Sequence, residues 1–124
     1  MPIEIMRWIE AFGLTLLFEF PIAFFLLQRR AFSSVRARRV AAAILFANLC
    51  THPAVWFIFP SLVEVPFGRA AYLAVAESWA VIIEALFYWC FIDETDLRVA
   101  FGASLLANGA SATLGAVVAR WCGI

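Results

Sequence analysis

Four long apolar stretches, separated by short segments that carry charged or turn-forming residues, set the pattern of this 124-residue chain. Each stretch has about 20 residues, which is the length that an α-helix needs to cross the hydrocarbon core of a bilayer. No stretch has the continuous polar stripe that a helix of a soluble bundle presents to water. The pattern therefore predicts an all-α membrane protein, a single domain over residues 1–124, whose four transmembrane helices form an up-down bundle. The expected spans are 8–28, 40–60, 70–92 and 99–121.

The composition agrees with a chain that lies in lipid. Hydrophobic residues make up 65% and charged residues 15% of the chain, whereas soluble domains are about half apolar and a quarter charged. The N-terminal segment has no basic region ahead of its apolar run. We therefore expect the start of a retained first span and not a signal peptide.

The arginines are distributed unevenly, although the formal net charge is zero. Five of the nine lie in residues 28–39, between the first two predicted spans. An excess of arginine in a short connection marks the cytoplasmic side of a membrane protein. We favour this interpretation over a nucleic-acid site, so the expected partner is the lipid bilayer. The prediction is a bacterial-type inner (plasma) membrane protein with the 28–39 loop in the cytoplasm and both termini in the periplasm.

The two other connections carry local signals. Residues 61–69 contain Pro66 and Gly68 and predict a short outer turn. The acidic segment before the fourth span offers Thr95 or Asp96 as the residue that caps this helix.

The second span has an unusual polar centre. Asn48 and His52 are four residues apart, so they lie on one face of a helix, with Thr51 beside them and Pro53 directly after. A polar side chain in a membrane span is costly without a partner and marks a candidate functional site.

The other three spans provide partners for these groups. Glu19 lies near the middle of the first span. In the third span, Glu77 and Glu84 are seven residues apart and share a face, about 10 Å from each other along the axis. The fourth span carries Asn108 and Ser111 beside a ridge of small residues suited to tight helix packing.

The helix rise of about 1.5 Å per residue places these polar groups in two neighbouring layers. Glu19, Asn48, Glu84 and Asn108 fall in the inner layer, and His52 and Glu77 in the outer one. The candidate ligand- or ion-binding site therefore comprises eight residues: Glu19, Asn48, Thr51, His52, Glu77, Glu84, Asn108 and Ser111.

The motifs of known metal sites are missing from the sequence. The chain has neither the Glu-x-x-His pairs of di-iron bundles nor the His-Glu-x-x-His motif of zinc proteases. A divalent cation held by His52, Glu77 and Glu84 stays open, and no cofactor is required. Two structural alternatives also stay open: Asn48 and Asn108 bonding each other across helices, and a neutral His52 paired with Glu77.

The leading functional hypothesis is the binding or translocation of a cation or proton at this intramembrane site. A structural or accessory subunit of a membrane complex is the first alternative. An intramembrane enzyme that uses His52 and a glutamate is the second, and the chain is more readily explained without catalysis. Because four helices enclose little of a path, we expect a homo-oligomer or a larger membrane complex.

Overall fold

The computed structural model describes residues 2–28 and 33–123. Four long helices account for most of this part of the chain, which contains no strand, and all four are long and apolar enough to cross a membrane. This confirms the predicted all-α four-helix bundle. The helices are α1 (Ile3–Leu27), α2 (Ser34–Pro53), α4 (Arg69–Phe91) and α5 (Leu97–Cys122).

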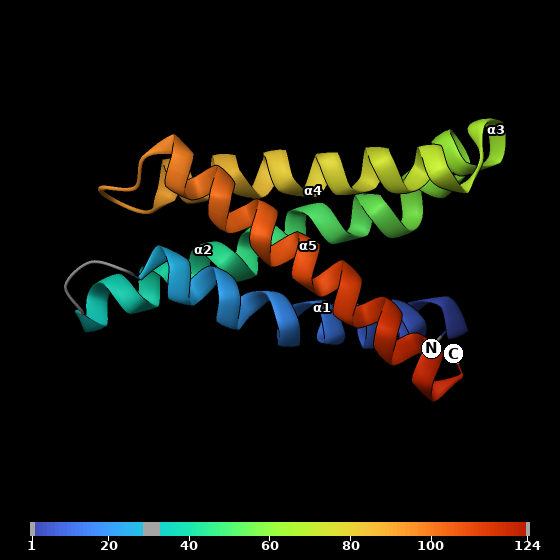
Figure 1. Ribbon diagram of the computed structural model, residues 1–124, viewed down its shortest axis with the longest axis horizontal. Helices are drawn as coiled ribbons and strands as arrows, with labels where there is room; N and C mark the ends of the chain where they lie inside the picture. Colours follow the sequence, from blue (N-terminus) through green and yellow to red (C-terminus); the bar gives the residue numbers. More distant parts are fainter. Residues whose placement is uncertain (1, 29–32, 124) are drawn as a thin grey trace.

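The four helices run alternately up and down (Figure 1), and the contacts between neighbouring helices close them into a ring. α2 packs between α1 and α4, and α5 packs against both α4 and α1. The start of α1 and the end of α5 lie at one end of the bundle, and the end of α1, the start of α2 and the α4–α5 connection lie at the other (Figure 1). Every helix therefore presents one side to a shared interior.

The interior holds small and polar side chains, whereas large apolar side chains point outward. The buried apolar residues are mainly alanines, such as Ala47 of α2 and Ala107 of α5. Leu17, Phe25 and Ile82 are among the many large apolar side chains on the outer surface. A surface of this kind suits hydrocarbon rather than water, and this fits a multi-pass membrane protein. The buried polar residues are Glu19, Asn48, Thr51, Glu84, Ser104 and Asn108.

The predicted turn over residues 61–69 is wrong for most of its length. After α2 the chain continues as two π-helical turns, η1 (Ala54–Ile58) and η2 (Pro60–Glu64), and as the short helix α3 (Val65–Phe67). Proline cannot donate a backbone hydrogen bond, and here the N–H of Phe59 reaches back five residues to the carbonyl of Ala54. The chain reverses only at Gly68, whose φ of 89° is readily adopted by glycine.

The predicted loop over residues 28–39 is also shorter than expected. α2 begins at Ser34, because the hydroxyl of Ser33 accepts a hydrogen bond from the N–H of Arg36 at 3.1 Å and caps the helix. Residues 29–32 lie outside the described part of the chain. Three of the five arginines of the predicted loop therefore lie on the first turns of a helix.

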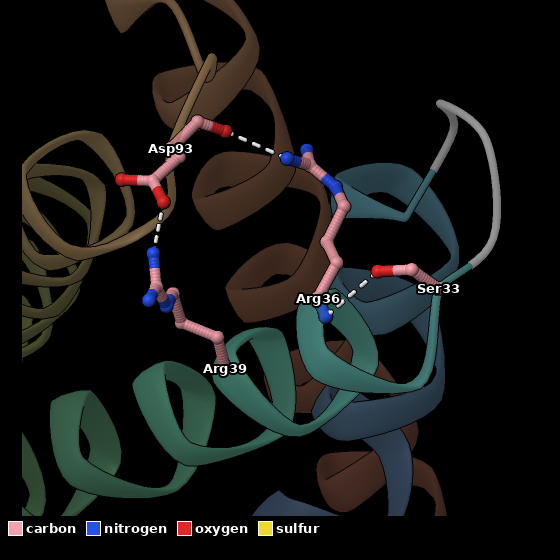
Figure 2. Close-up of polar contacts among 4 residues, drawn as sticks. All are labelled: Ser33, Arg36, Arg39 and Asp93. Carbon is pink, nitrogen blue, oxygen red and sulfur yellow. Dashed lines mark hydrogen bonds and ion pairs between the residues drawn. The ribbon is translucent and has the colours of Figure 1, made fainter.

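Two of these arginines reach across to the α4–α5 connection (Figure 2). The guanidinium of Arg36 donates to the backbone carbonyl of Asp93 at 2.6 Å, and Arg39 forms an ion pair with the Asp93 carboxylate. We call Arg36, Arg39 and Asp93 the arginine–aspartate cluster. Next to it, Asp96 accepts a hydrogen bond from the N–H of Val99 at 2.9 Å, which confirms the predicted cap of α5. The cluster thus ties the first turns of α2 to the α4–α5 connection.

Candidate functional site

Two glutamates lie side by side in the centre of the bundle. Glu19 of α1 and Glu84 of α4 are 0% and 1% exposed and line the same cavity. Both residues fall near the middle of their helices. Two acidic groups thus share a space that the surrounding helices close off.

Three neutral side chains donate hydrogen bonds to these carboxyls. The amide of Asn48 donates to Glu19 Oε1 at 2.8 Å. The hydroxyl of Thr51 donates to Glu84 Oε1 at 2.9 Å, and the amide of Asn108 donates to Glu84 Oε2 at 2.6 Å. The five residues come from all four helices, and we call them the central carboxyl cluster.

The local helix geometry orients both asparagines. The amide nitrogen of Asn48 also donates to the carbonyl of Ile44 at 3.1 Å, and that of Asn108 to the carbonyl of Ser104 at 3.0 Å. Each amide is therefore held against its own helix, four residues back, while its second hydrogen points at a glutamate. The alternative of a direct Asn48–Asn108 bond is wrong for this structure.

A cavity of about 120 Å³ adjoins the cluster and extends to Thr15 and Glu77, which precede Glu19 and Glu84 on their helices. This volume has room for several water molecules. Its lining includes all eight residues of the predicted site, together with Thr15 and several small side chains, of which Ala80 and Ala112 leave space between the helices. The structure thus brings the eight residues together around one cavity, and their role in ligand binding stays a prediction. They are Glu19, Asn48, Thr51, His52, Glu77, Glu84, Asn108 and Ser111.

His52 lines this cavity but does not pair with a glutamate. Its Nε2 lies 3.3 Å from the hydroxyl of Thr15, and its Nδ1 is buried with no partner among the described residues. The rings of Phe12 and Trp56 lie 5.2 and 6.3 Å from the imidazole, centroid to centroid. These contacts turn His52 toward α1, so the expected His52–Glu77 pairing is not formed.

Glu77 has a different environment from the other two glutamates. Its side chain is exposed at the outer surface of α4 while also lining the cavity. It makes no hydrogen bond or ion pair with any residue in the described ranges. Glu77 and Ala112 additionally line a groove between α4 and α5 on the outer surface, so Glu77 stands between the cavity and the surrounding medium.

The metal site considered from the sequence is not assembled. Within residues 2–28 and 33–123, no group of three or more histidine, cysteine, aspartate or glutamate side chains is arranged to hold a metal ion. His52, Glu77 and Glu84 share the cavity without forming such a group. The enzyme hypothesis, in which His52 and a glutamate act as base or metal ligand, stays a prediction; the histidine contacts Thr15 in this structure.

Two residues that contact the site were not predicted as part of it, although the sequence already places Ser104 on the polar stripe of the fourth span. Thr15 precedes Glu19 by four residues and Ser104 precedes Asn108 by four, so both lie on faces already marked as polar. The Ser104 hydroxyl donates to the carbonyl of Val81 at 2.9 Å and joins α5 to α4. The four-residue spacing was the signal that could have identified both.

The comparisons with known proteins add no relative. The chain matches no family model, and no curated protein or solved structure is significantly similar to it. The arrangement of the site is therefore the basis for any functional proposal.

Proposed function

We propose that the central cavity binds a proton or a small cation within the membrane, and that Glu19 and Glu84 are the groups that accept its charge. The observation that carries this proposal is the pair of adjacent buried carboxyls whose hydrogen-bond partners are all neutral. Two negative charges side by side in a span are strongly unfavourable. A bound proton or cation removes this repulsion.

The hydrogen-bond count around the pair supports the same proposal. Asn48, Thr51 and Asn108 supply donors to three of the four carboxyl oxygens. The fourth, Glu19 Oε2, is buried and has no partner within the described chain. A proton on this pair, or a cation beside it, gives the remaining oxygen a partner.

The packing on the two sides of the pair indicates the direction of access. Ala76, Glu77 and Ala80 line the cavity and precede Glu84 on α4, toward the end where α1 starts and α5 ends. One turn beyond Glu84, toward the connections, Tyr88 is fully buried among apolar residues such as Leu27. If the arginine-rich end lies in the cytoplasm, as the sequence predicts, the cavity belongs to the periplasmic half of an inner-membrane protein.

The test is proton flux into liposomes that contain the purified chain. Glu84→Gln and Glu19→Gln keep an acceptor oxygen but remove the acidic group, so each should abolish the flux while the protein stays folded. Glu10→Gln, an exposed glutamate of the same helix as Glu19, is the control and should retain it. Normal flux in both the Glu84 and Glu19 variants would refute the proposal.

A second candidate function, a structural or accessory subunit, is favoured by one observation. The bonds of the central carboxyl cluster all join different helices: α2 to α1, α2 to α4 and α5 to α4. Interhelical bonds of this kind stabilise helix association in lipid, and assembly into a homo-oligomer or larger complex would be the function. In that case the wild-type chain carries no flux, and the Glu→Gln variants assemble normally.

A further inference from the structure

The hydrogen-bond donors of the cavity lining are almost all used within the protein. Asn48 directs its amide hydrogens to Glu19 at 2.8 Å and to the Ile44 carbonyl at 3.1 Å. Asn108 directs its own to Glu84 at 2.6 Å and to Ser104 at 3.0 Å. The hydroxyls of the lining are occupied as well: Thr51 donates to Glu84, and Ser111 to the carbonyl of Asn108 at 3.1 Å.

Several acceptors of the lining, in contrast, are unused. Glu19 Oε2 has no partner among the described residues, and neither carboxyl oxygen of Glu77 accepts a hydrogen bond from them. The amide oxygens of Asn48 and Asn108 also receive no hydrogen bond from the described chain, since each amide is turned with its nitrogen toward a glutamate. One unused acceptor therefore comes from each of the four long helices.

A lining with unused hydrogen-bond acceptors and few unused donors favours a ligand that donates hydrogen bonds. An anion would find one unused donor at most, on the His52–Thr15 pair, and would meet the glutamates. A ligand that carries several N–H groups and a positive charge satisfies the acceptors and balances the carboxyls together. The cavity of about 120 Å³ restricts this ligand to a small one.

We propose that the cavity binds a small N–H cation, either ammonium or a short protonated amine such as methylammonium. This inference rests on the proposed function, because it names the class of cation that the site takes. Glu19 and Glu77 provide the charged acceptors, and the amide oxygens of Asn48 and Asn108 provide the neutral ones. Alkali ions share the charge but have no N–H groups, which makes the two classes separable by experiment.

The experiment is thermal unfolding of the purified chain in detergent micelles, at neutral pH and constant ionic strength. Ammonium chloride and methylammonium chloride should raise the Tm in a saturable manner. Potassium chloride should raise it less, because the same oxygens can coordinate potassium but potassium donates no N–H bond, and tetramethylammonium chloride should not raise it. An equal rise with potassium or tetramethylammonium would overturn the inference.

Matched variants assign the effect to the cavity. Glu19→Gln and Glu77→Gln should each weaken the apparent affinity for ammonium about tenfold or more, since each removes one charged acceptor. Glu10→Gln should leave the affinity unchanged, because Glu10 does not line the cavity. Wild-type affinity in both cavity variants would contradict the inference.

Proton flux measured without ammonium separates this inference from the proposed function. A chain that shows Glu84-dependent proton flux but no ammonium-induced rise in Tm refutes the N–H cation and leaves the proton site in place. A chain with neither property refutes both.

Discussion

The central carboxyl cluster and the arginine–aspartate cluster both join helices through charged side chains, yet they balance charge in opposite ways. At the end of the bundle, Asp93 meets two arginines, and the Arg39 and Asp93 side chains are 49% and 75% exposed. In the centre, Glu19 and Glu84 face each other with only neutral donors. Opposite charges at the solvent-exposed end balance each other, whereas the two interior carboxyls have only neutral donors among the described residues, and this contrast is the basis of the proposed proton or cation site.

This difference separates two roles that charged residues have in one small protein. An exposed ion pair contributes about 0–1 kcal/mol to stability, so the arginine–aspartate cluster is suited to orientation and to fixing the connections. Buried acidic groups in a span are costly and are retained for function or for assembly. The predictions below test this division.

The largest expected effect concerns the orientation of the whole chain. If the arginines set the topology, a C-terminal reporter that is active only in the periplasm should be active in the wild-type protein. Replacing all five arginines between residues 28 and 39 with glutamine should reduce this activity and produce chains of mixed orientation. A reporter that is active only in the cytoplasm, fused at the same position, is the complementary measurement, and strong activity there in the wild type would contradict the prediction.

The second prediction concerns Glu84, to which Thr51 and Asn108 both donate. Glu84→Leu leaves two buried donors unpaired and should lower the free energy of unfolding by about 2–4 kcal/mol. Glu84→Gln keeps an acceptor oxygen for one of the two donors and should cost less, about 1 kcal/mol. Denaturant unfolding in mixed micelles provides both values. Equal losses in the two variants would show that the hydrogen bonds are not what Glu84 contributes.

The third prediction concerns the removal of a single hydroxyl from the central carboxyl cluster. Thr51→Val preserves the shape of the side chain but removes the 2.9 Å bond to Glu84. The free energy of unfolding should fall by about 1 kcal/mol, in the range measured for hydrogen bonds between membrane helices. Thr113→Val is the matched control, because the Thr113 hydroxyl donates only to the carbonyl of Gly109 on its own helix. A larger loss of unfolding free energy in Thr113→Val than in Thr51→Val would mean that these hydroxyls stabilise the protein mainly through bonds within their own helix.

Periodicity and helix rise in the sequence predicted the fold and the residues that make up the site. They did not predict which of these residues contact one another. The 20-residue apolar runs predicted the four helices, and the helix rise placed Glu19 and Glu84 at one depth, where the structure pairs them. Periodicity does not specify how a side chain turns around its helix. His52 packs against the ring of Phe12 on α1 and therefore contacts Thr15 of the same helix, and not Glu77 as expected. The π-helical turns after Pro53 depend on backbone hydrogen bonds between residues five apart, which the residue pattern does not predict.

The smallest expected effect belongs to the arginine–aspartate cluster. Arg39→Gln removes the ion pair with Asp93, and the free energy of unfolding should fall by less than about 1 kcal/mol because both side chains are largely in contact with solvent. The loss should shrink further at high salt, which screens exposed charges. Arg38→Gln is the control, since the Arg38 side chain donates to the carbonyl of Ser34 on its own helix and contacts no acidic group among the described residues. Unfolding in mixed micelles at low and high salt measures both variants. A salt-independent loss of several kcal/mol in Arg39→Gln would mean that this surface contact holds the bundle together as strongly as the central carboxyl cluster does, and the division of roles between the two clusters would fail.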